Sequence, residues 1–236
     1  MLNFSALHII ILVRYMINET RQNDSGSHSL VTLEGYMAAQ QALLYVLYMK
    51  DKEFIRDMRK EYINMNVFDA LQKRFAFLFQ EFKNIYISFS GGKDSGVLLN
   101  LLLDYRNKYA SDRVIGVFHQ DFEAQYTVTT DYITRTFKRL ENESGIDLYW
   151  VCLPMATRTA LSSYEMYWYP WDETKQDIWV RPIPEYPYVI NLAKPFTHYR
   201  YRMHQEDLAK QFGRFYKEEH GNGSTVCLLG RRANES

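Results

Sequence analysis

The sequence has little cysteine: among its 236 residues there are two, Cys152 and Cys227, and no C-x-x-C pair. Two thiols without that spacing exclude the disulfide framework of a small secreted domain, and they exclude a cysteine-based zinc site. The composition therefore predicts a protein of the reducing cytoplasm.

The sequence also lacks an excess of either charge, since Lys+Arg 28 is balanced by Asp+Glu 28. A neutral chain has no bulk electrostatic attraction to nucleic acid, so tight binding without sequence preference would require a local basic patch. The charge balance therefore argues against the strongly basic class of nucleic-acid-binding proteins.

A long hydrophobic run is absent from the N-terminal region. The apolar stretch at residues 7–13 is shorter than the roughly 20 apolar residues that a membrane-spanning helix needs, and it has no basic start or small-residue cleavage site. We therefore expect no membrane partner. Residues 19–29 are polar and predict a linker within a helical N-terminal extension, residues 1–64, which precedes a second domain at 65–236.

Strands and helices alternate from Asn66 onward. Asn66 is placed to cap a helix at 67–82, in which apolar residues recur every three or four positions from Phe68 to Phe82. This alternation predicts an α/β fold with a doubly wound, mostly parallel sheet. The predicted strands are 85–89, 113–118, 146–153 and 225–229, and the further helices are 97–103, 126–140 and 208–219.

Residues 154–220 differ in composition, because tyrosine and tryptophan are interleaved there with proline. Proline breaks a long helix or a central strand, so we predict an insertion over the sheet. Two interpretations stay open: a lid or substrate platform whose rings and arginines meet a planar anion, or a cap packed on itself. The same composition is typical of a surface for single-stranded nucleic acid. The arginines considered for the anion are Arg158, Arg181, Arg200 and Arg202.

The most informative stretch joins a strand to a helix through residues 90–96, SGGKDSG. Glycines permit positive φ and close approach of an anion, and the free amides of a helix N-terminus converge on it, so this turn predicts a phosphate-binding loop. Lys93 would add a mobile positive charge, and Ser90 and Ser95 would add hydroxyl donors. Asp94 would order the loop or help to hold a metal ion. The Walker pattern G-x-x-x-x-G-K-[ST] is absent.

Three segments carry a resemblance to a known family: SFSGGKDSGVLLNL, the W-V-R-P run in the insertion and the final L-G-R-R-A-N-E-S. The first is similar to the SGGxDS pyrophosphate loop (PP-loop) of the N-type ATP pyrophosphatases. Within them the chain resembles the phosphoadenylylsulfate (PAPS) reductase family, including proteins of the immunoglobulin-binding regulator A type. The resemblance covers residues 66–236 and implies a Rossmann-like fold of the adenine nucleotide alpha-hydrolase type.

The resemblance implies a site for ATP or PAPS with Mg²⁺, in which Lys93 and Asp94 carry the catalysis. Asp121 would follow the second strand and meet ribose or, with Asp94, the metal ion. His119 and Glu123 are alternatives for that role, and all three are otherwise turn and helix-cap residues. The implied nucleotide contacts are Ser90, Gly91, Gly92, Lys93, Asp94, Ser95, Asp121 and Arg232.

Arg232 stands at the arginine of the family's G-x-R-x-x-x-S segment, where it would face phosphate or sulfate. Because the chain ends within this segment, we expect further sequence in the parent protein.

Many members of the family activate an acceptor oxygen by adenylation and release pyrophosphate, and we expect that chemistry here on an unidentified acceptor. The reductase branch instead attacks a sulfonucleotide with a cysteine in an E-C-G-x-H context, which is absent. Reduction would therefore need a cysteine outside this chain, since Cys152 is expected to be buried and inert. Two other classes stay open: a regulatory nucleotide-binding module that works with a protein partner or as a homo-oligomer, and a nucleic-acid-modifying enzyme.

Overall fold

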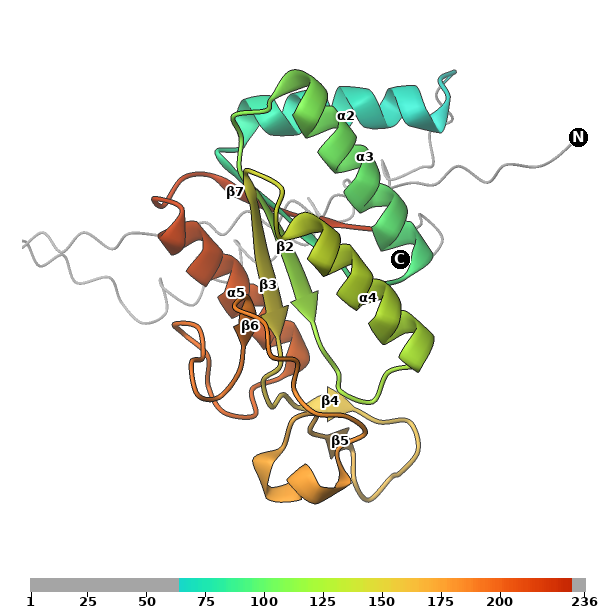
Figure 1. Ribbon diagram of the computed structural model, residues 1–236, viewed down its shortest axis with the longest axis vertical. Coiled ribbons are helices and arrows are strands. Elements are labelled where there is room, and N and C mark those ends of the chain that lie inside the picture. Colours follow the sequence, from blue (N-terminus) through green and yellow to red (C-terminus); the bar gives the residue numbers. More distant parts are fainter. Residues whose placement is uncertain (1–63, 231–236) are drawn as a thin grey trace, which may run out of the picture. The chain divides into compact units, whose positions relative to one another are not determined.

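The computed structural model of the chain describes residues 64–230, in which helices cover a five-stranded sheet (Figure 1). The predicted N-terminal extension, with its linker at 19–29, and the predicted phosphate contact Arg232 lie outside these residues. Within the described part, strands and helices alternate as the sequence predicts.

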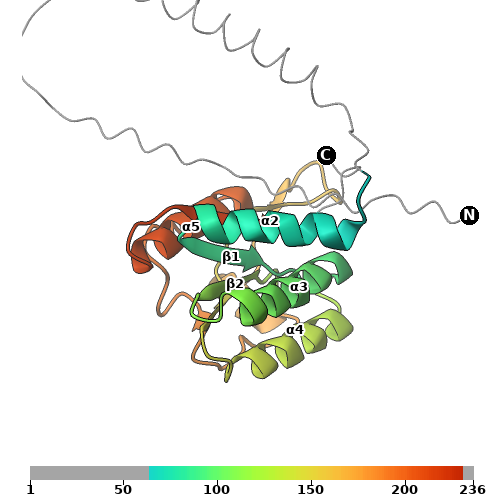
Figure 2. The same ribbon diagram turned by 90° about the horizontal axis from the view of Figure 1, so that it is seen from above.

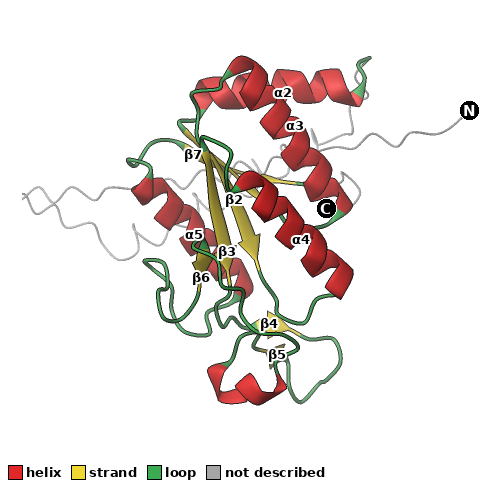
Figure 3. Ribbon diagram, viewed as in Figure 1, coloured by secondary structure: helices red, strands yellow, loops and turns green. Residues whose placement is uncertain are grey.

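The sheet consists of β1 (Asn84–Ser88), β2 (Ile115–Gln120), β3 (Ile146–Val151), β6 (Val189–Ile190) and β7 (Thr225–Leu229). The strand order is β6-β3-β2-β1-β7, and all neighbours are parallel. The chain moves from β1 to β3 in one direction and later places β7 on the other side of β1 (Figure 3). The predicted parallel α/β class is therefore confirmed.

The ends of three strands differ from the prediction. β1 spans Asn84–Ser88, one residue earlier at each end than predicted. β2 begins two residues late and continues to Gln120, because its ladder with β3 extends to the pair Gln120 and Val151. His119 consequently lies inside the strand and not in the turn after it. β3 ends at Val151, two residues before the predicted end.

Helices lie on both faces of the sheet. Figure 2 shows α3 and α4 on one side of the strands and α5 on the other. Such two-sided cover makes the strands apolar on both faces, which explains why they are continuous apolar runs in the sequence. The α-helices of the described part are α2 (Val67–Glu81), α3 (Lys93–Tyr109), α4 (Thr127–Leu140) and α5 (Gln205–Glu219).

Helix α2 begins where the sequence predicts. The side chain of Asn66 accepts a hydrogen bond from the amide of Asp69 at 2.8 Å, which satisfies one free donor of the first turn. At the other end, Arg113 donates to three backbone carbonyls. Phe68 was predicted to join the buried stripe but is 55% exposed, so the stripe begins at Leu71.

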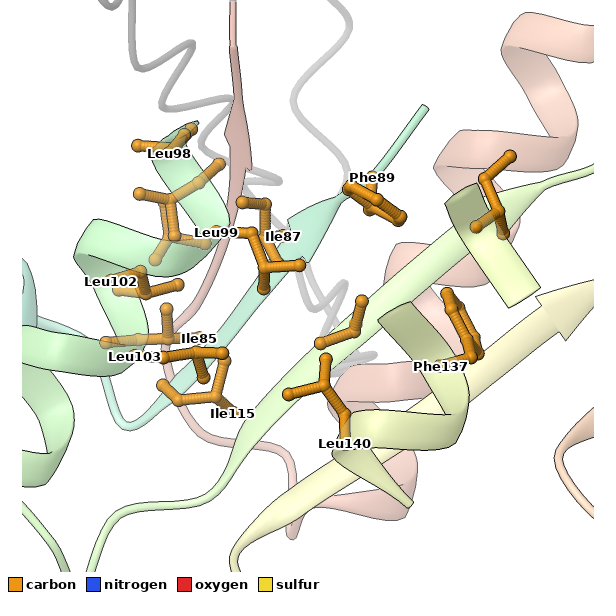
Figure 4. Packing of buried hydrophobic residues seen from close by; sticks show 14 of the residues in the cluster. Ile85, Ile87, Phe89, Leu98, Leu99, Leu102, Leu103, Ile115, Phe137 and Leu140 are labelled. Carbon is orange, nitrogen blue, oxygen red and sulfur yellow. The ribbon is translucent and has the colours of Figure 1, made fainter. Parts of the chain in front are cut away.

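Alternate residues of each strand serve two separate cores. Ile85 and Ile87 of β1 join the core beneath α3 and α4, while Tyr86 between them joins the core beneath α5. Figure 4 shows the first core, where Leu99 of α3 lies beside Ile87 of β1 and Leu103 lies beside Ile85. This alternation positions β1, and the loop that follows it, from both sides.

The core beneath α5 is mainly aromatic. Phe212 stacks on Phe118 with ring centroids 4.0 Å apart and meets Tyr86 edge-on at 5.6 Å. Gly116 leaves room for Tyr216, because a Cβ at Gly116 would come within 2.6 Å of the tyrosine ring. The helix is thereby held close against the sheet.

An irregular segment, residues 152–204, follows β3 at the carboxyl end of the strands. It contains the antiparallel pair β4 (Thr157–Arg158) and β5 (Tyr167–Trp168) and the 3-10 helix η1 (Glu173–Ile178), which lie below the end of β2 in Figure 1. We call this segment the insertion. The range predicted from composition, 154–220, extends further and also contains α5, which covers the main sheet. Strand β6 lies within both ranges and belongs to the main sheet.

Strand β6 was not predicted from the sequence, because prolines surround it. Its two residues pair with β3 at the edge of the sheet, and Pro187 lies two residues before Val189. An edge position tolerates the missing amide donors of prolines, which a central strand would not.

None of the helices in the described part combines the length and apolarity that crossing a membrane requires.

The aromatic core gives a test of the fold. We expect Phe212→Ala to lower the free energy of unfolding by about 3–5 kcal/mol, because a buried ring with several aromatic neighbours is removed. Phe77→Ala removes the same group from a 56% exposed position on α2 and should cost less than about 0.5 kcal/mol. Urea denaturation followed by circular dichroism compares the two, and equal losses would contradict this packing.

Candidate functional site

The loop between β1 and α3 is closed on itself through two serine hydroxyls. Ser95 Oγ donates to the carbonyl of Gly92 at 3.0 Å and lies 3.0 Å from Ser90 Oγ. The amides of Ser90 and Gly92 donate to Ser95 Oγ and Ser90 Oγ, each at 3.3 Å. Both hydroxyls predicted as phosphate donors therefore also hold the loop in its own shape.

Sterics explain one of the two glycines between β1 and α3. Gly91 has φ of +77°, and a Cβ there would lie 2.6 Å from Cγ1 of Ile133 on α4. Gly92 has φ of −76° and is the N-cap of α3, where it supplies no side-chain hydrogen bond. Helix α4 is thus packed directly on Gly91, and the start of α3 is left without a capping side chain.

The start of α3 has the features of an anion site. A helix N-terminus directs amide donors and the positive end of its dipole outward, so it favours a bound anion. The Lys93 side chain is 76% exposed at this position, and its ammonium lies 4.0 Å from a carboxylate oxygen of Asp94, whose side chain is 21% exposed. An extended, mobile cation therefore stands at the edge of the loop.

The end of β7 passes against the first turn of α3. A Cβ at Gly230 would lie 2.9 Å from the carbonyl carbon of Asp94 and 2.9 Å from the amide nitrogen of Ser95. Because strand order reverses between β1 and β7, this is the edge where open α/β sheets hold ligands. Arg231 and Arg232 follow Gly230 directly and lie outside the described residues.

The predicted site residue Asp121 is fully buried, and its carboxylate is occupied by the protein's own donors. Arg181 of the insertion lies 2.6 Å from Oδ1, and the indole of Trp150 donates to Oδ2 at 2.6 Å. The amide of Glu123 donates to Oδ1 at 2.7 Å, and the thiol of Cys152 donates to Oδ2 at 3.6 Å. In this structure Asp121 offers no exposed oxygen to a ribose or a metal ion.

Charge and burial act on Asp121 and His119 together. Burial by itself would raise the pKa of Asp121, but interactions with His119 and Arg181 and the hydrogen bond from Trp150 outweigh it and lower the pKa. Burial lowers the pKa of His119. His119 Nδ1 lies 2.8 Å from the carbonyl of Phe89 and therefore carries the proton.

Glu123 connects β2 to the insertion. It is buried, has φ of +62°, and accepts the amides of Trp171 and Val180 at 3.1 Å each. The hydrogen bonds of this carboxylate go to the insertion, and those of Asp121 go to Arg181, Trp150, Cys152 and the amide of Glu123. The described residues also contain no cluster of three or more His, Cys, Asp and Glu side chains that could hold a metal ion. The Mg²⁺ site at Asp94 and Asp121 stays a prediction.

From the sequence we considered Arg181 as a contact for an external anion, whereas in the structure it pairs with Asp121. A second arginine of the insertion, Arg202, pairs with the buried Asp172 at 2.6 Å. Nothing in one sequence links residues so far apart, so the pairs could not be predicted. Trp150 and its bond to Asp121 were missed for the same reason.

The insertion contains both buried and exposed aromatic residues. Trp171 is 1% exposed and donates through its indole to the carbonyl of Asp121, so part of the segment is packed on the sheet. Leu161 and Tyr164 are 97% and 98% exposed, so another part presents apolar groups to solvent. One part of the insertion is therefore packed on the sheet, and another part is exposed to solvent.

A groove of about 560 Å³ lies at the opposite, amino end of β1, where Lys83, Arg113 and His220 line it. It is separated from the loop by the length of the strand and contains none of the predicted site residues. We therefore place the candidate site at the loop and not in this groove.

We expect the two glycines between β1 and α3 to differ in how well they tolerate an added side chain. Gly91→Ala should lower the free energy of unfolding by about 2 kcal/mol or more, because it forces positive φ and a close contact with Ile133. Gly92→Ala has ordinary φ and a nearest contact of 3.3 Å, so a loss under about 1 kcal/mol is expected. Urea denaturation measures both; a Gly92→Ala loss as large as that of Gly91→Ala would contradict the loop geometry.

The two thiols are expected to be inert in the folded protein. Burial raises the pKa of Cys152 well above its ordinary value and that of Cys227 to about 12. At pH about 8, Ellman's reagent should therefore react with neither thiol until guanidinium is added, when both should react. Rapid release of a chromophore equivalent from the native protein would overturn this assignment.

The chain was compared with known proteins. It is 28% identical over 172 residues to the uncharacterized protein YbdN of Escherichia coli (strain K12), a match that covers 73% of this chain and 40% of that protein. This chain thus spans less than half the length of that relative. No family model and no solved structure matches the present chain.

Proposed function

We propose that the chain is an adenine-nucleotide-binding protein of the PP-loop type, with the Rossmann-like fold that its resemblance to the PAPS reductase family implies. The observation that carries the proposal is the loop at residues 90–95. It joins the carboxyl end of a central parallel strand to a helix whose N-cap supplies no side chain, at the edge where the strand order reverses.

The described residues fit a polyphosphate better than a neutral ligand. Amides at the start of α3 and the ammonium of Lys93 supply positive potential, and the absence of a Cβ at Gly92 leaves the backbone approachable. Asp94 is the carboxylate at this edge that would hold Mg²⁺, and a bound Mg²⁺ would neutralise charge on the phosphates. ATP and PAPS share this phosphate chemistry.

We favour adenylyl transfer as the reaction. An acceptor oxygen attacks the α-phosphorus of ATP, the bond from that phosphorus to the bridging oxygen breaks, and pyrophosphate leaves with the electron pair. Lys93 would stabilise the charge that develops on the phosphates as this bond breaks. The acceptor is an unidentified nucleophile.

Thiol-based reduction of PAPS receives no support from the two cysteines of this chain. Cys152 is fully buried and donates to Asp121, and burial raises the pKa of both thiols. A reductase built on this domain would need a cysteine from outside this chain.

The proposal predicts a specific role for Lys93. Lys93→Ala should weaken ATP binding about 10- to 100-fold, because a charge-assisted contact to phosphate is lost. Lys108→Ala removes the same charge from the far end of α3, where the ammonium lies 4.9 Å from the ring of Tyr109, and should bind like the parent. Isothermal calorimetry with ATP and Mg²⁺ measures the affinities, and a coupled assay measures pyrophosphate release.

Each alternative has its own outcome. ATP affinity without pyrophosphate release for any acceptor would identify a regulatory nucleotide-binding module. Steeply salt-dependent binding of RNA or DNA would favour a nucleic-acid-modifying enzyme. Equal affinity of the parent and Lys93→Ala would remove Lys93 from the site.

A further inference from the structure

The residue that precedes the phosphate loop is fixed by the neighbouring strand. The amide of Phe89 donates to the carbonyl of Phe118 at 2.8 Å, and the carbonyl of Phe89 accepts Nδ1–H of His119 at 2.8 Å. Phe89 is fully buried, and Ser90 follows it as the first residue of the loop. His119 therefore holds the point from which the loop starts.

The same histidine contacts the buried cluster that anchors the insertion. Its ring meets that of Trp150 edge-on, with centroids 5.3 Å apart, and the indole of Trp150 donates to Asp121. Asp121 pairs with Arg181, and its carbonyl accepts the indole of Trp171 at 3.1 Å. Polar and ring contacts thus run without interruption from the phosphate loop to the insertion.

Buried nitrogen atoms without hydrogen-bond partners lie at both ends of this series of contacts. Among the described residues, Nε2 of His119 and both Nε and Nη1 of Arg181 are buried without a hydrogen-bond partner. Buried polar nitrogens without partners are rare and costly, so this arrangement is less stable than one in which they are satisfied. A shift of the insertion would change the environment of Arg181 first and that of His119 through Trp150 and Asp121.

We propose that His119 is a positioning residue that couples the insertion to the phosphate loop, so that order in the segment around Arg181 sets the geometry of residues 90–95. His119 does not contact the nucleotide in this proposal. The effect on nucleotide affinity rests on the proposed function, whereas the coupling between the two segments does not.

Hydrogen–deuterium exchange of the full chain without nucleotide tests the coupling directly. Arg181→Met should raise exchange about tenfold in peptides covering residues 89–95, although Arg181 contacts none of them in the described structure. Arg202→Met is the matched control, because it breaks an arginine–aspartate pair of the same 2.6 Å length that stays within the insertion. It should raise exchange in the insertion alone.

Two substitutions at His119 separate positioning from packing. Asn places an amide donor near the position of Nδ1, so His119→Asn should keep the bond to Phe89 and stay within about threefold of the parent in loop exchange. His119→Phe fills the space without a donor and should match Arg181→Met. Where ATP binds the parent, both His119→Phe and Arg181→Met should weaken it about tenfold, and His119→Asn should not.

The outcomes are distinct. Unchanged loop exchange in Arg181→Met, or equal loop exchange in the Asn and Phe variants, would overturn the coupling. A parent protein that binds no ATP, while the exchange pattern follows expectation, would overturn the proposed function and leave the coupling intact. If His119→Phe does not fold, the comparison of Arg181→Met with Arg202→Met decides the question.

Discussion

The buried carboxylate of Asp121 is the constraint on which the carboxyl edge of the sheet depends. A charge removed from water is costly unless partners surround it, and here Arg181, Trp150 and a backbone amide surround it. Because these partners come from β3, the insertion and the turn after β2, compensating this one charge holds three segments relative to one another. Removing a partner would leave the charge uncompensated, so the edge is ordered as a unit.

The loop is fixed by a second, steric constraint. Gly91 lies against Ile133 of α4, and Gly230 lies against the first turn of α3, so helix and strand approach the loop more closely than any side chain would allow. The serine hydroxyls close the loop from within. The result is a rigid turn at the edge of the sheet where strand order reverses, with amides and an exposed ammonium on its outer side.

The insertion shows the limit of what can be inferred about contacts from amino-acid composition. Its aromatic residues predicted either a stacking platform or a packed cap, and the structure buries Trp171 on the sheet and leaves Tyr164 exposed. Composition alone could not show which aromatic residues are buried, because burial depends on contacts with residues remote in the sequence. The same reason explains why Arg181, considered for an external anion, is found on Asp121.

The sequence by itself determined the parallel α/β class, the cap at Asn66 and the glycine turn between the first strand and its helix, because these follow from periodicity, local hydrogen bonding and backbone freedom within a few residues. Tertiary structure decided the extension of β2 to Gln120, the edge strand β6 and the burial of Asp121. Each of these depends on a partner strand or a counter-charge distant along the chain, and only folding brings such partners together.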